Sequence, residues 1–221
     1  MRARFTALSC GAGEPRAACA EPPMSVDLSI LLLLHDLGPA VTTMVRDARE
    51  LGHALAGEAD FEILALDERS GDNTLSFLSI LHAQVPELRT LQDLARGSGV
   101  SQGARVARGR RWLVIDRPIS AELLRWALLQ VRDQGHPAAI VPGSVLALTA
   151  STGIAALYDL RGGLVSGQRA VERNLRKAGS QRAAWRPAPE HGVARRALLY
   201  LQRQLIRRGL GDRRQGSSGE P

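Results

Sequence analysis

The sequence has little cysteine and no long apolar segment. Both cysteines, Cys10 and Cys19, precede the part of the chain that could form a core, so we expect neither a disulfide framework nor a cysteine metal site. No unbroken apolar run exceeds five residues, as in Ile30 to Leu34, whereas a membrane-spanning helix needs about 20. These absences favour a cytoplasmic protein that is soluble or attached to a membrane surface.

Lysine is almost absent. Lys177 is the only one among 29 basic residues, an arginine bias that is typical of a GC-rich bacterial genome. Acidic residues are scarce in one region only. Residues 1–160 carry 15 arginines against 18 acidic residues, whereas residues 161–214 carry 14 basic residues against three acidic ones. A segment this basic is suited to the phosphates of nucleic acid or of a lipid surface.

The length of 221 residues allows one large domain with an appendage, and 44% hydrophobic residues are enough for a core. Residues 1–24 mix Gly, Pro, Ala and Arg without periodicity and lack the apolar stretch of a signal peptide. We expect them to be a disordered leader or to precede the true start at Met24. Residues 25–160 are expected to form the domain, and residues 161–221 a basic extension.

Apolar runs alternate with amphipathic segments in residues 25–160. The run from Leu28 to Leu34 is typical of a strand buried on both faces. Further strands are predicted at 61–66, 88–91, 112–115 and 138–141, and helices at 39–56, 72–81, 98–108 and 120–134. This alternation implies parallel pairing with right-handed crossovers. The predicted fold class is α/β, a Rossmann-like open, mostly parallel sheet with helices on both faces, plus a basic C-terminal helix.

Acidic residues lie where the predicted strands end. His35-Asp36 follows the first strand, Asp67-Glu68 the second, and Asp116 the strand at 112–115. Ligands of open parallel sheets bind at the carboxyl ends of the strands, and carboxylates there can accept hydrogen bonds from a nucleobase or ribose. In the alternative interpretation, Asp72 caps the next helix and Asp67-Glu68 is a solvated turn.

The order of these motifs resembles the nucleotide-sugar-binding half of family 2 glycosyltransferases over about residues 26–145. That family typically has a first strand ending in Tyr-Asn-Glu and a second ending in Asp-Asp-x-Ser-x-Asp-x-Thr. A glycine-rich helix closed by Ala-Arg-Gly and a strand ending in Asp-x-Asp follow. The matching residues are Asp67, Glu68 (for the second Asp), Ser70, Asp72, Thr74, Ala107, Arg108, Gly109 and Asp116.

The resemblance implies a GT-A fold that transfers a sugar from a nucleoside-diphosphate sugar to an acceptor. The residues implied to bind the nucleotide are His35, Asp67, Glu68, Asp116 and Arg117. Asp116 is also the implied ligand of a divalent metal, Mg²⁺ or Mn²⁺, that neutralises the leaving diphosphate.

Two motifs depart from the family. Residues 35–37 read His-Asp-Leu instead of Tyr-Asn-Glu, and residues 116–118 read Asp-Arg-Pro, so the metal motif lacks its second carboxylate. Metal binding is therefore expected to be weak, although Arg117 could itself bind a diphosphate. No catalytic base is identified; Asp133 and Asp159 are the candidates. The alternative function is a non-catalytic descendant that binds a nucleotide or a membrane surface.

A dinucleotide site is a competing interpretation. Gly97, Gly99 and Gly103 precede a strand-end acid, Asp116, roughly as in a dinucleotide fingerprint, but the spacing is wrong by one residue.

The basic extension contains an amphipathic segment near residues 193–208. Three leucines (Leu198, Leu201 and Leu205) share one face, and Arg195, Arg196, Arg203 and Arg207 populate the other. This pattern suits either an anionic membrane surface or a helix packed on the domain. Binding to nucleic acid is not expected, since the extension has few aromatic residues for stacking, Trp185 and Tyr200.

Overall fold

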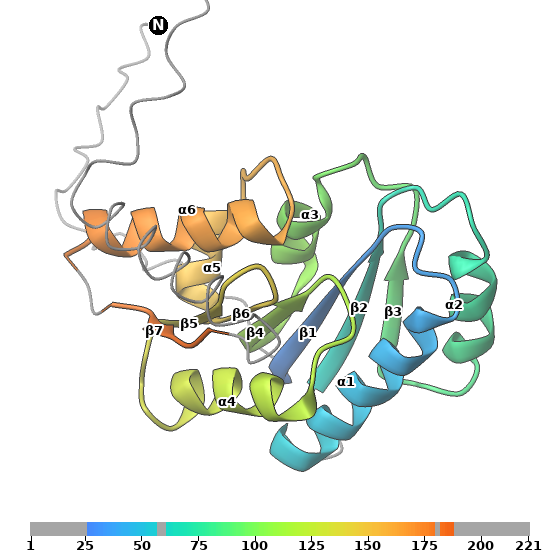
Figure 1. Cartoon of the computed structure of the whole chain (residues 1–221), viewed down its shortest axis with the longest axis horizontal. Coiled ribbons are helices and arrows are strands. Elements are labelled where there is room, and N and C mark those ends of the chain that lie inside the picture. Colours follow the sequence, from blue (N-terminus) through green and yellow to red (C-terminus); the bar gives the residue numbers. More distant parts are fainter. Residues whose placement is uncertain (1–25, 57–60, 180–181, 188–221) are drawn as a thin grey trace, which may run out of the picture.

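The computed structural model describes residues 26–56, 61–179 and 182–187, which form one seven-stranded sheet between two layers of helices (Figure 1). The strands are β1 (Val26–Leu34), β2 (Phe61–Asp67), β3 (Leu88–Leu91), β4 (Gly109–Ile115), β5 (Ala138–Val141), β6 (Val145–Thr149) and β7 (Ala184–Trp185). The helices are α1 (Ala40–Ala56), α2 (Thr74–His82), α3 (Gly99–Val106), α4 (Ala121–Arg132), α5 (Ala150–Leu157) and α6 (Leu164–Lys177). The strand order is β3-β2-β1-β4-β6-β5-β7, and only the pairings of β6 are antiparallel.

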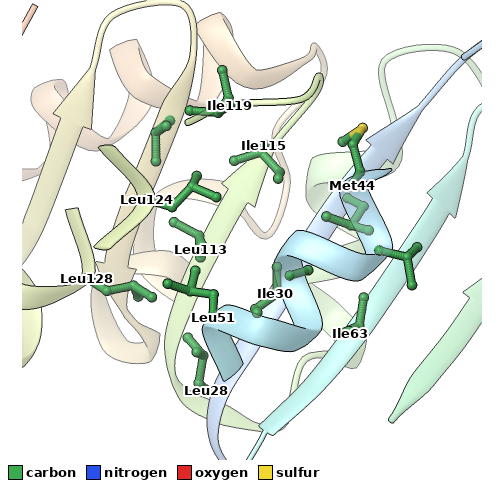
Figure 2. Packing of buried hydrophobic residues seen from close by; sticks show 14 of the residues in the cluster. Leu28, Ile30, Met44, Leu51, Ile63, Leu113, Ile115, Ile119, Leu124 and Leu128 are labelled. Carbon is green, nitrogen blue, oxygen red and sulfur yellow. The ribbon is translucent and has the colours of Figure 1, made fainter. Parts of the chain in front are cut away.

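The apolar run of β1 is buried on both faces of the sheet. Ile30 and Leu32 pack in one cluster with α1, α2 and α4, and Leu31 and Leu33 pack in the other with α3, α5 and α6. Figure 2 shows part of the first cluster, in which Ile30 lies near Leu51 of α1 and Leu113 of β4. A central strand covered on both faces explains a run without polar alternation. The predicted α/β class is confirmed.

Parallel pairing brings three strand ends to one edge of the sheet. Leu34, the last residue of β1, is in register with Asp67, the last residue of β2. Ile115, the last residue of β4, is in register with Leu32. The residues that follow these strands therefore lie at one edge, which we call the carboxyl edge.

Helix α6 begins beyond the domain boundary expected at residue 160. Its buried side chains include Leu164, Val171 and Leu175, which belong to the same cluster as the inner strands. Buried Gln168 donates from Nε2 to the carbonyls of Val141 and Val145, both at 2.9 Å, and accepts from the amide of Gly143 at 3.0 Å. The helix thus holds the β5–β6 turn, and the sequence interpretation missed it.

A buried carboxylate joins three strands at the opposite edge of the sheet. Glu62 of β2 is 2% exposed and accepts hydrogen bonds from Ser29 of β1, at 2.8 Å, and from the amide of Arg108, at 2.7 Å. The guanidinium groups of Arg89 and Arg108 bind its other oxygen. Burial raises the pKa of Glu62, but the hydrogen bonds from Arg108, Ser29 and Arg89 outweigh it, so the pKa lies below its usual value.

Candidate functional site

Each of the first three strands is followed by a tight loop that contains a left-handed residue. These residues are Asp36 (φ 50°), Arg69 (φ 56°) and Asp93 (φ 58°), each two positions beyond the end of its strand. Aspartate adopts this conformation more readily than most residues, whereas for arginine it is uncommon. Arg69 Nε also donates to Asp93 Oδ1 at 2.8 Å, which links the second loop to the third.

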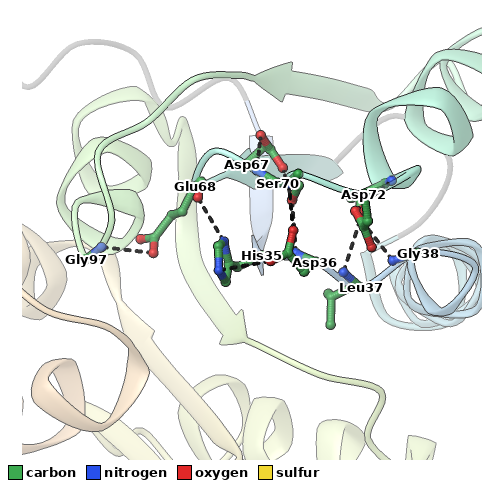
Figure 3. Close-up of polar contacts among 11 residues, drawn as sticks. His35, Asp36, Leu37, Gly38, Asp67, Glu68, Ser70, Asp72 and Gly97 are labelled. Carbon is green, nitrogen blue, oxygen red and sulfur yellow. Dashed lines mark hydrogen bonds and ion pairs between the residues drawn. The ribbon is translucent and has the colours of Figure 1, made fainter.

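The loops after β1 and β2 are fastened by side chains of both (Figure 3). The amide of Gly71 donates to Asp36 Oδ1 at 2.7 Å, and the amide of Asp36 donates to Ser70 Oγ at 3.1 Å. The hydroxyl and amide of Ser70 donate in turn to Asp67, whose side chain is fully buried. Asp67 therefore holds the loop that follows β2 in place from a buried position.

Glu68 is bound through both carboxylate oxygens. The amide of Gly97 donates to Oε2 at 2.9 Å and the amide of Gly99 donates to Oε1 at 2.7 Å, so the negative charge lies at the N-terminus of α3. These glycine amides therefore bind a side chain of the protein itself, unlike the phosphate-binding amides of a dinucleotide fingerprint. This contact was not predicted from the sequence.

His35 lies between the two loops. Its Nδ1 is 3.0 Å from the carbonyl oxygen of Glu68 and its Nε2 is 3.2 Å from Asp36 Oδ2. Because a carbonyl only accepts, we assign a proton to Nδ1 from this contact. The side chains of His35 and Asp36 are 31% and 49% exposed, so both can be reached by a ligand at this edge.

Thr74 fastens the entry to α1. Its hydroxyl oxygen accepts from the amides of Leu37 and Gly38 at 3.0 and 2.9 Å and donates to Asp72. The hydroxyl and amide of Thr74 hold the pKa of Asp72 below its usual value. The polar residues of the sequence motif thus form hydrogen bonds that hold the loops of the carboxyl edge together: Ser70, Asp72 and Thr74.

The loop between α5 and α6 reaches the carboxyl edge as well. The amide of Gly162 donates to the carbonyl of Gly97 at 2.7 Å, and a Cβ at Gly97 would lie 3.4 Å from the Gly162 Cα. Arg161, which is exposed, precedes this contact. This loop was not predicted from the sequence, because residues 97 and 162 are joined only in the tertiary structure.

Asp116 and Arg117 follow β4 at the carboxyl edge. Arg117 donates from Nε to Asp116 Oδ1 at 2.8 Å and from Nη2 to Oδ2 at 3.3 Å. The two side chains are 27% and 55% exposed. Arg117 therefore neutralises the carboxylate that the resemblance assigned to a metal.

A divalent metal does not fit this arrangement. Both oxygens of Asp116 already accept from Arg117, and the next side chain, Pro118, offers no oxygen. In the part of the chain that the structure describes, no three His, Cys, Asp or Glu side chains are grouped as metal ligands. Hard cations need several oxygen ligands, and one neutralised carboxylate is a poor donor set.

The structure thus joins His35 to the Glu68 carbonyl and links Asp67 to Asp36 through Ser70. It puts Asp116 and Arg117 at the same edge. Each of the two candidate bases is paired with an arginine, and Asp159 lies in the loop between α5 and α6. Asp133 directly follows α4 and accepts from Arg132 at 2.6 Å, and Asp159 accepts from Arg105 of α3 at 2.9 Å.

Several expectations concern segments outside the described residues: the leader with Cys10 and Cys19, and the amphipathic segment at 193–208. Within the described residues, no helix combines the length and hydropathy that crossing a bilayer requires.

No protein-family model matches the chain, and no curated protein matches its sequence. Solved structures do match. A mannosyltransferase from Pyrobaculum calidifontis, in complex with GDP-Man and Mn²⁺, superposes with a TM-score of 0.58 at 14% identity, covering 92% of this chain and 68% of that one. Glucosyl-3-phosphoglycerate synthase from Mycobacterium tuberculosis, in complex with Mg²⁺ and UDP, gives 0.56 at 11% identity, covering 85% and 81%.

TarS from S. aureus, in complex with UDP, gives a TM-score of 0.54 at 12% identity, and this chain spans 61% of its length. At these identities the likeness establishes the fold.

Proposed function

We propose that this chain, whose fold is that of GT-A glycosyltransferases, binds a nucleoside-diphosphate sugar at its carboxyl edge. One observation carries the proposal: His35, Asp67, Glu68, Asp116 and Arg117 follow or end parallel strands at a single edge. Ligands of open α/β sheets bind at such an edge. The similar structures hold GDP-Man or UDP.

The residues of the carboxyl edge divide into two kinds. Asp67 and Glu68 are bound to loop groups and hold the shape of the site. His35 and Asp36 are partly exposed, so their polar groups can meet a base or ribose hydroxyl. Arg117 supplies the positive charge for a diphosphate.

Sugar transfer by this chain is proposed to be reduced or lost. General-base catalysis needs a proton-accepting side chain within hydrogen-bond reach of the hydroxyl group that receives the sugar. Asp133 lies at the end of α4 that is remote from the carboxyl edge and is paired with Arg132. Asp159 is paired with Arg105. We therefore propose that the chain binds a nucleotide sugar and that it transfers the sugar slowly or not at all.

Calorimetric titration of the full chain with UDP, GDP, UDP-glucose and GDP-mannose, each with and without Mn²⁺, tests binding. His35→Gln should weaken nucleotide affinity by about tenfold, the value of one lost hydrogen bond. Glu50→Gln, an exposed change on α1, is the matched control and should leave affinity unchanged. Absence of binding to all four nucleotides at millimolar concentration would reject the function.

A second proposed partner is an anionic lipid surface, which implies a peripheral position at the cytoplasmic membrane. One observation favours it: α6 exposes four basic residues, Arg169, Arg173, Arg176 and Lys177, and Glu172 is the helix's only acidic residue. Near an anionic bilayer each such residue contributes about 1 kcal/mol. The basic face leads into the extension that contains the segment at 193–208.

Co-sedimentation with vesicles rich in phosphatidylserine tests this partner. Binding by the full chain should fall with salt, and it should weaken when the chain ends at Glu190 or when Arg169 and Arg173 are changed to Gln. Phosphatidylcholine vesicles are the control. Equal sedimentation with both lipids would reject an electrostatic membrane contact.

A further inference from the structure

The position of Arg117 is restrained on both sides. It directly follows Asp116, at the end of β4, and precedes Pro118, which disfavours helical backbone at the residue before it. Ile119 is then buried at 7% exposure in the cluster beneath α4, and α4 begins at Ala121. Five residues thus connect two packed elements, which holds the backbone of Arg117 at the carboxyl edge.

The ion pair between Asp116 and Arg117 holds a positive charge in a fixed orientation. Asp116 binds the Nε and Nη2 donors of Arg117, which fixes the plane of the guanidinium as a carboxylate fork does. Arginine keeps its charge at every physiological pH and matches phosphate oxygens in geometry. An ion-paired arginine therefore offers a phosphate a positive group that needs no metal to be present.

We propose that Arg117, held by Asp116, replaces the divalent cation, so that this chain recognises the diphosphate of its nucleotide without metal. The inference rests on the proposed function. It explains why the second carboxylate of the metal motif can be absent, because a carboxylate at residue 118 would only compete with the phosphate for the guanidinium. A metal ion at Asp116 would in turn be repelled by Arg117.

A purely structural role for the pair is the competing interpretation. In that role Arg117 would only neutralise Asp116 at the end of β4, and nucleotide affinity would not respond to its removal. Nucleotide-binding measurements on Arg117 variants separate the two roles. A structural role predicts a change in stability alone, whereas the proposed role predicts a loss of nucleotide affinity.

The test is calorimetric titration of the full chain with UDP and with GDP, in EDTA and in Mn²⁺. Wild-type affinity should agree within about twofold between the two conditions and should fall with added salt. Arg117→Gln should weaken binding in EDTA by about tenfold to a hundredfold, the range for a charge-assisted hydrogen bond, and Arg117→Lys by less. Arg125→Gln, an exposed change on α4, should bind as wild type.

A designed reversal adds a second readout. The double variant Arg117→Ala and Pro118→Asp should gain Mn²⁺-dependent nucleotide binding, with Mn²⁺ alone detected by electron paramagnetic resonance. Circular dichroism of each variant checks that it is folded. Wild-type binding that requires Mn²⁺, or an Arg117→Gln variant that binds as wild type, overturns the inference and leaves the proposed function intact. Absence of nucleotide binding under both conditions overturns both.

Discussion

Gly99 donates its amide to Glu68 over 2.7 Å and has no space for a side chain, because a Cβ there would lie 2.8 Å from Glu68 Oε1 and 3.1 Å from Leu33 Cδ2. The glycine at the N-terminus of α3 thus fits the carboxylate at the end of β2. The family resemblance implied that Glu68 binds the nucleotide, and the competing dinucleotide interpretation used Gly99 as a phosphate-binding glycine. In the structure the amide of Gly99 donates to Glu68.

Gly99→Ala should destabilise the protein by about 1–3 kcal/mol, because the added methyl group forces Glu68 or Leu33 to move. Gly167→Ala in α6 is the matched control. Its Cβ would meet neighbours at 3.5 Å or more, so the change should be neutral or stabilising by about 0.5–1 kcal/mol. Urea unfolding of both variants measures the difference, and equal stabilities would contradict the close packing of Glu68.

Glu62→Gln should lower stability near neutral pH by about 1–3 kcal/mol, because buried hydrogen bonds to two arginines are weakened. The pKa of Glu62 is lowered in the folded protein, so its stabilisation is present above roughly pH 5 and is lost as the pH falls through the folded value. The wild type and the variant should therefore converge in acid. Unfolding curves from pH 7 to pH 3 test this, and a constant difference would contradict it.

Gln168→Glu should destabilise the β5–β6 turn, because an ionised carboxylate would face the carbonyls of Val141 and Val145, where Nε2 now donates. The expected loss at pH 7 is about 2 kcal/mol. Burial beside acceptors raises the pKa of the new carboxyl, so stability should recover as the pH falls and the group becomes a donor. Thermal unfolding at pH 7 and pH 5 measures this recovery, and a loss that grows in acid would contradict the assigned contacts.

Release of UDP or GDP from sugar nucleotides should be slow or undetectable for the wild type, with or without Mn²⁺. Restoring a carboxylate by Arg117→Ala and Pro118→Asp should improve Mn²⁺ binding and should leave turnover low, because the candidate bases Asp133 and Asp159 remain paired. A coupled assay for released nucleotide measures both forms. Rapid metal-dependent transfer by the wild type would contradict the proposed loss of activity.

The central part of the fold was predicted well from the sequence because its strands and helices have clear apolar patterns. The apolar residues of β1 and the stripe of α4 leave little choice of structure, and the strand-end rule then brought His35, Asp67 and Asp116 to one edge. Helix α6 was missed because Gly167 and Gln168 occupy its buried face, which breaks the apolar periodicity.

The contacts of the site were not predictable from spacing. The bond from Gly97 to Glu68 joins residues 29 positions apart, and the bond from Gly162 to Gly97 joins loops that no local pattern connects. Which polar groups satisfy one another depends on loop conformations such as the left-handed backbone of Arg69, which its residue type does not suggest.

The central position of β1 also has a kinetic consequence. Leu31 pairs with Leu64 of β2, 33 residues away, and with Val114 of β4, 83 residues away. Closing the longer loop costs about 0.8 kcal/mol more chain entropy, so we expect the β1–α1–β2 unit to assemble before β4 docks. Trp112 is buried on β4, and its fluorescence should therefore report a late stage of refolding, after helical circular dichroism has begun to recover.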